Sequence, residues 1–117
     1  MFQVNNKNYL VLVRFKEFMI LLDKTLENVP RKDMFYKDEI RKECVSVLEL
    51  IIKIGYDEEK QISDGLLIRS KIGVIDFLLD RLYNLSYITE KQIYNLGLHL
   101  SEIIKMINGI VKNGSKV

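Results

Sequence analysis

Apolar residues recur along this chain at alternating steps of three and four, a spacing that places them on one face of an α-helix. The clearest run opens at Thr89, whose hydroxyl can accept a hydrogen bond from the Gln92 amide while the Gln92 side chain accepts one from the Thr89 amide. This capping box and the run that follows it predict a helix over residues 89–112. The apolar positions of the run are Ile93, Leu96, Leu100, Ile103, Ile107 and Ile110.

Three earlier runs with the same spacing predict helices over residues 8–29, 35–55 and 61–85. Pro30 ends the first of them, because a proline disfavours the helical conformation of the residue before it. The inward-facing positions are expected to be Leu12, Phe15, Met19, Leu22, Leu26 and Val29, then Ile40, Cys44, Val47, Ile51 and Ile54, and finally Ile68, Ile72, Ile75, Leu79 and Leu82.

Several residues suit the ends of these helices. Asp33 is expected to cap the second helix, and Gly55 is expected to end it in a left-handed conformation. Ser63 or Asp64 is expected to cap the third. Because the links between the helices are short, neighbouring helices must run in opposite directions. The sequence, with 48% hydrophobic residues and one proline, therefore predicts a single all-α domain over residues 1–117, an up-down-up-down antiparallel four-helix bundle.

The second, third and fourth predicted helices carry a second apolar row beside the inward one. Soluble monomers avoid large exposed apolar patches, and association of identical chains is a common way to cover them. We therefore predict a closed homo-oligomer that buries the second row. The predicted interface residues are Val45, Leu48, Ile52, Leu67, Val74, Leu78, Ile104 and Val111.

Residues suited to catalysis or metal binding are few. The single cysteine, Cys44, excludes an internal disulfide, and the single histidine, His99, leaves too few ligands for a zinc site. The chain has no phosphate-binding loop, no Gly-x-Ser-x-Gly and no His-Glu-x-x-His, and the adjacent acids at 57–59 lack the spacing of a calcium loop. We therefore expect no enzyme activity, no metal and no cofactor.

Charge and hydropathy limit the partners that the chain can have. The apolar run at residues 9–13 is too short for a signal-peptide core or a membrane span, so we expect a cytoplasmic protein without a membrane partner. The net charge is only +2, with 18 basic and 16 acidic side chains. A site for a polyanion must therefore come from local clustering of bases.

Such a cluster exists within residues 31–42, and we call its five bases the basic corner. Lys37 and Arg41 are four residues apart on one helix, where like charges repel each other unless an anion such as phosphate lies between them. Asp33, Asp38 and Glu39 could instead neutralise the cluster in place, and the residues alone leave both interpretations open. The basic corner consists of Arg31, Lys32, Lys37, Arg41 and Lys42.

Three segments of the chain resemble a family of small four-helix-bundle proteins. They are Pro30 with the two bases that follow it, residues 40–52, and residues 102–112, which are similar to the family's closing Glu-Ile-Gly-Arg-Met-Leu-Gly-Gly-Trp segment. The family includes accessory variability determinant (Avd-type) proteins of diversity-generating retroelements and proteins encoded in ribosomal RNA intervening sequences. The second branch has an Asn-Ile-Ala-Glu-Gly segment that residues 50–56 lack, so the chain resembles the Avd-type branch more closely. The closing segment departs from the family pattern at Ile104, Lys105, Asn108 and Ile110.

The resemblance implies a homopentameric barrel with a basic surface that binds RNA or DNA and associates with a reverse transcriptase. On this hypothesis the chain is a nucleic-acid-binding accessory subunit of a diversity-generating retroelement, and the basic corner contacts its template RNA or the DNA. The alternative hypothesis is a helical oligomerisation module that binds only protein and uses its charges for solubility. Salt dependence separates the two, because binding through phosphate contacts weakens steeply as the salt concentration rises.

Overall fold

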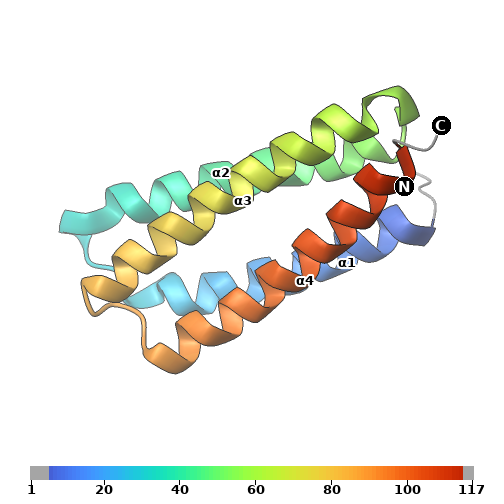
Figure 1. Ribbon diagram of the computed structural model, residues 1–117. Coiled ribbons are helices and arrows are strands. Elements are labelled where there is room, and N and C mark those ends of the chain that lie inside the picture. Colours follow the sequence, from blue (N-terminus) through green and yellow to red (C-terminus); the bar gives the residue numbers. More distant parts are fainter. Residues whose placement is uncertain (1–5, 115–117) are drawn as a thin grey trace.

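The computed structural model, which describes residues 6–114, consists of four α-helices and three short 3-10 turns. The helices are α1 (Asn6–Thr25), α2 (Met34–Ile54), α3 (Gln61–Asn84) and α4 (Glu90–Gly114), and the turns are η1 (Leu26–Asn28), η2 (Arg31–Asp33) and η3 (Glu58–Lys60). Helices that follow each other in the sequence run in opposite directions, and α4 returns beside α1 (Figure 1). No β-strand occurs in the described part of the chain. The predicted all-α, four-helix fold is therefore confirmed.

The predicted bounds of the four helices agree with the observed ones to within two residues, except at the end of the first helix. There the last turn tightens into η1, and Val29 and Pro30 then take extended conformations with ψ angles of 120° and 162°. A proline cannot donate a backbone hydrogen bond, and it favours extended backbone in the residue before it. The predicted break at Pro30 is confirmed.

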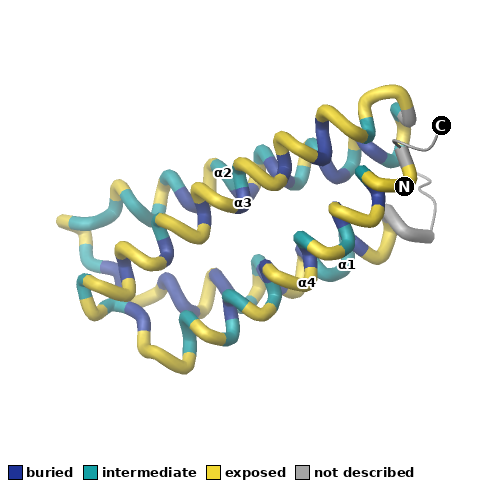
Figure 2. Tube along the Cα trace, in the orientation of Figure 1, coloured by how far each residue is buried: buried dark blue, intermediate teal, exposed yellow. Residues whose placement is uncertain are grey.

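All four helices contribute buried residues to the core, and on α2, α3 and α4 the buried faces match the predicted rows. Every inward position predicted on α2 and α3 is buried, and on α4 only Ile93 is left half-buried. Figure 2 shows these buried positions recurring along each helix, separated by exposed ones. The spacing of apolar residues was therefore sufficient to predict which sides of these three helices face inward.

The inward row predicted for α1 is wrong at two positions. Val11 and Phe18 are buried, whereas Leu12 and Met19 are half-buried. The helix is apolar at 9–13 and again at 18–22, so two neighbouring faces satisfy the same spacing and differ by a rotation of one residue. The observed rotation buries the larger aromatic ring of Phe18, whose centroid lies 5.8 Å from that of Phe15, in place of a methionine.

The capping box at the start of α4 is confirmed. The Thr89 amide donates to Gln92 Oε1 at 2.9 Å, and the Gln92 amide donates to Thr89 Oγ1 at 3.1 Å. The left-handed end predicted for α2 is wrong, because Gly55 has φ −67° and ψ −19°. The amides of Gly55 and Tyr56 still bond carbonyls of the last helical turn, so the chain leaves α2 without reversing its backbone handedness.

The side-chain caps predicted for α2 and α3 are also wrong. Asp33 stands at the N-cap position of α2, but its carboxylate makes no capping hydrogen bond. The turn η3 leads directly into α3, which begins at Gln61, before both predicted caps. Ser63 instead donates to the Lys60 carbonyl, and Asp64 is turned inward, 6% exposed, with one carboxylate oxygen 3.5 Å from Lys53 Nζ.

Candidate nucleic-acid interface

The basic corner lies at the end of the bundle that holds η2, the start of α2 and the link between α3 and α4 (Figure 1). Arg31 and Lys32 are exposed on η2. On α2, Lys37 is half-buried, whereas Arg41 and Lys42 are exposed. Adjacent helical residues point about 100° apart, so Lys42 faces a different direction from Arg41. The five bases therefore surround one end of α2 and do not form a single row.

In the described part of the chain, one base of the basic corner forms an ion pair with an acid. Arg41 Nη2 lies 3.9 Å from Asp23 Oδ1 of α1, and both side chains are more than half exposed. Exposed pairs of this kind contribute little binding energy and leave the base free to take another partner. Among residues 9–57 and 59–113, no ion pair joins the other bases of the corner to a carboxylate. Those other bases are Arg31, Lys32, Lys37 and Lys42.

Asp33, one of the acids that could neutralise the corner, accepts a hydrogen bond from a tyrosine in another part of the chain. The Tyr87 hydroxyl, in the link between α3 and α4, donates a hydrogen bond to Asp33 Oδ2. This bond, with partial burial, raises the pKa of the Tyr87 phenol. The contact holds η2, which carries two of the five bases, against the neighbouring link.

Backbone geometry in that link brings Tyr87 to Asp33. Ser86 adopts a left-handed conformation with φ 69°, which is uncommon for a residue other than glycine. The amides of Ser86 and Tyr87 bond the carbonyls of Tyr83 and Leu82, so the last turn of α3 is closed by the chain that reverses over it. Sequence analysis did not identify Tyr87, because a contact between two links leaves no local pattern.

An aromatic pair borders the basic corner on the side of α3. Phe35 is 65% exposed, and its ring meets the ring of Tyr36 edge to face, with centroids 5.5 Å apart and planes at 74°. Arg81 of α3 reaches the same tyrosine: its Nε lies 3.4 Å from the Tyr36 hydroxyl, and its guanidinium carbon lies 6.0 Å from the ring centroid. The hydrogen bond raises the pKa of Arg81. The sequence did not predict the group formed by Phe35, Tyr36 and Arg81. The position of Phe35 between Lys32 and Lys37 was the one signal that could have indicated it.

The eight predicted interface residues lie on three sides of the bundle. Val45 is half exposed, and Leu48 and Ile52 line an apolar groove of about 430 Å³ between α1 and α2, together with Met19 and Ile20 of α1. The next three, Leu67, Val74 and Leu78, share a face of α3 with Lys71, which pairs with Glu43 of α2 at 3.7 Å. The last two, Ile104 and Val111, are half-buried and pack against the core within the chain.

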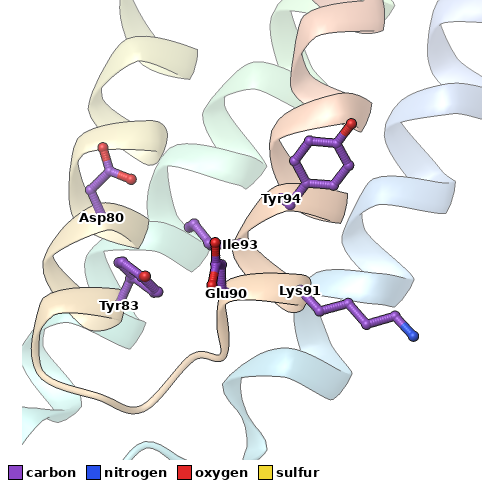
Figure 3. A pocket seen from close by; sticks show the side chains of 6 residues that line it. All are labelled: Asp80, Tyr83, Glu90, Lys91, Ile93 and Tyr94. Carbon is purple, nitrogen blue, oxygen red and sulfur yellow. The ribbon is translucent and has the colours of Figure 1, made fainter.

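A hollow of about 620 Å³ lies between the end of α3 and the start of α4, and Figure 3 shows the side chains that line it. The Lys91 side chain extends away from Asp80 and Tyr83, which lie on the α3 side of the hollow. Cys44 is completely buried, and no three metal-ligating side chains come together in the described part of the chain. The side chains lining this hollow are Asp80, Tyr83, Glu90, Lys91, Ile93 and Tyr94.

None of the described helices is long and apolar enough to cross a membrane. In comparisons with known proteins, neither a family model nor a curated protein sequence matches this chain. Function is therefore inferred from the residues and their arrangement.

Proposed function

We propose that this protein is a nucleic-acid-binding accessory subunit of a diversity-generating retroelement, which associates with the reverse transcriptase and its template RNA. The observation that supports the proposal most is that four bases of the basic corner form no ion pair with an acid in the described part of the chain. Unpaired cations gathered at one end of a helix bundle suit a phosphate backbone, because each phosphate contact releases counterions. The reverse transcriptase and the retroelement enter only through the sequence resemblance.

Self-association is part of the proposal, with five chains in a closed ring as the resemblance implies. A ring repeats the basic corner, so contacts that are weak singly act together on one nucleic acid. This bears on the modest net charge of +2, which would make a single chain a weak ligand for RNA or DNA. The half-exposed residues Val45, Leu67 and Val74 are available for such contacts.

The second candidate is a helical module that binds only protein. The apolar groove between α1 and α2 favours it, because grooves of this kind accept the apolar face of a helix. Binding in the groove would depend on apolar area and would respond little to salt. The two candidates therefore predict opposite results in a salt titration.

The test is a filter-binding titration of structured RNA and of DNA at two salt concentrations, with the wild type and Arg41→Glu. We expect the wild type to lose affinity steeply as salt rises and Arg41→Glu to bind every sequence more weakly, because phosphate contacts position a nucleic acid without reading its bases. The ion pair between Arg41 and Asp23 is exposed, so its loss should lower the free energy of unfolding by less than about 1 kcal/mol.

Lys105→Glu is the matched control, because it changes the charge equally on α4, away from the basic corner. It should bind RNA as the wild type does, and the helicity and mass of both variants should be unchanged. Equal binding by Arg41→Glu and the wild type, or no binding by the wild type at low salt, would favour the protein-only module.

A further inference from the structure

Phe35 is placed as a binding residue would be and not as a core residue. It stands in the first turn of α2 between η2 and Lys37, and nearly two thirds of its surface is open to solvent. Lys42 is seven residues further along, two helical turns on, and lies on the same side of α2 about 10 Å away along the axis. The exposed ring therefore follows the two bases of η2 in the chain and shares its side of α2 with Lys42.

The ring of Phe35 has an ordered neighbour. Tyr36 meets it edge to face, and Arg81 holds Tyr36 through its hydroxyl and its ring. Edge-to-face pairs and cation–π contacts each stabilise a defined arrangement of rings. Phe35 therefore rests on a group fixed by two helices, and a ligand that stacks on it meets a surface that is already in place.

A second exposed ring lies on the α3 side of the same group. Phe77 is 72% exposed and is four residues from Arg81, so both residues occupy one face of α3. Arg81 in turn contacts Tyr36 of α2. The outer surface where α2 and α3 meet thus carries two exposed phenylalanines, one on each helix, with Arg81 and Tyr36 linking the helices between them.

Exposed aromatic rings next to lysine and arginine side chains allow a protein to distinguish single-stranded from double-stranded nucleic acid. In a duplex the faces of the bases are stacked on each other, so a protein side chain reaches mainly phosphates and groove edges. In a single strand the faces of the nucleobases are open. They stack on aromatic side chains, while nearby lysine and arginine side chains hold the phosphate backbone of the nucleic acid. The combination of rings and cations on this surface suits unpaired nucleotides.

We propose that the outer α2–α3 surface next to the basic corner binds single-stranded nucleic acid, with a base stacked on Phe35 and a second aromatic contact at Phe77. The proposal rests on the nucleic-acid binding proposed above and adds the form of the ligand. Phe35 supplies stacking, Arg31, Lys32 and Lys42 hold phosphates, and Tyr36 with Arg81 positions the Phe35 ring.

The experiment compares an unstructured single-stranded RNA with the same RNA annealed to its complement, by fluorescence anisotropy. Phe35→Ala should weaken binding of the single strand by about fivefold to a hundredfold and leave binding of the duplex unchanged. Phe35→Trp should bind as the wild type does, because it restores a stacking surface, whereas Phe35→Leu should bind as weakly as Phe35→Ala. Tyr94→Ala is the matched control, since Tyr94 is equally exposed on α4 and should not affect binding.

The outcomes separate this inference from the function on which it rests. If the wild type binds neither RNA at low salt, the proposed function fails and the inference fails with it. If the wild type binds both forms and Phe35→Ala binds them equally well, the function stands and the inference is wrong. Wild-type affinity in Phe35→Leu, or a lower oligomer mass in Phe35→Ala, would show an apolar or protein contact in place of stacking and would overturn the inference.

Discussion

Cys44 is completely buried on the inward face of α2, and this burial raises the pKa of its thiol to about 12. The carboxylates of Asp23 and Glu43 contribute further, because a thiolate near them would be a second negative charge. In the unfolded chain the thiol ionises near its ordinary value of 9.0. The unfolded state therefore loses this proton first, and the free energy of unfolding must fall as the pH rises from 9.0 towards 12.

We predict that Cys44 makes the free energy of unfolding fall by up to about 1.4 kcal/mol per pH unit across this alkaline window. Urea denaturation of the wild type and of Cys44→Ala at a series of pH values measures this contribution, because both proteins contain all the other ionisable side chains. Below pH 9.0 the difference in stability between them should be constant. If the free energies of unfolding of the two proteins fell in parallel above pH 9.0, a group other than Cys44 would cause the alkaline loss of stability.

Some residues of the candidate site could be predicted from the sequence and others could not. The five bases could be identified because they lie close together in the chain, and Lys37 and Arg41 have helical spacing. The contacts that organise the surface could not, because Tyr36 and Arg81 are 45 positions apart and Asp33 and Tyr87 are 54 apart. Such pairs meet only after the helices have packed.

At the scale of whole helices, the sequence predicted those parts that depend on periodicity or on a local hydrogen bond. The inward faces of α2 and α3 and the capping box at Thr89 are of this kind. The rotation of α1 was not predictable, because two of its faces are apolar and packing against α2 and α4 decides between them. The end of α2 at Gly55 also depends on the chain that follows, which continues into η3 without a left-handed residue.

The approach of α3 to α4 depends on a glycine. A Cβ added at Gly65 would lie 2.4 Å from Val111 Cγ2, whereas one added at Gly73 would meet nothing within 4 Å. The branched side chain of Val111 has one strongly preferred rotamer in a helix, so it cannot swing aside easily. Val111 was predicted to be an interface residue, and this contact gives it a role in packing within the chain.

We predict that Gly65→Ala lowers the free energy of unfolding by about 1–3 kcal/mol through overpacking. Gly73→Ala, which adds the same methyl group to the same helix, should raise the free energy of unfolding by about 0.5–1 kcal/mol because alanine favours the helix. Urea denaturation of the two variants isolates the contact with Val111. If Gly65→Ala were as stable as Gly73→Ala, α4 would be able to move away from the added methyl group without loss of stability.

At the scale of the whole molecule, polar and apolar surfaces are unevenly distributed. The bases of the basic corner gather at one end, the exposed phenylalanines lie on the α2–α3 side, and the apolar groove lies between α1 and α2. Of the predicted interface residues, Leu48 and Ile52 lie at the groove between α1 and α2, whereas Val74 of α3 is three residues from Phe77 and therefore close to the proposed nucleic-acid surface. Mutation of the residues at the groove should therefore disrupt association without touching the proposed nucleic-acid surface, whereas mutation of Val74 is expected to affect both.

We predict that light scattering at micromolar concentration gives a mass several times 13.8 kDa, with five chains as the expected number. Val45→Glu and Val74→Glu should lower this mass, because each places a charge on a half-exposed apolar residue of the predicted interface. Both side chains are exposed in the single chain, so the helicity of each variant should match the wild type. Leu98→Glu, at a residue 52% exposed on α4 and outside the predicted rows, is the control and should keep the wild-type mass. A wild-type mass near 13.8 kDa would refute the oligomer, and the basic corner would then have to bind nucleic acid as a single site.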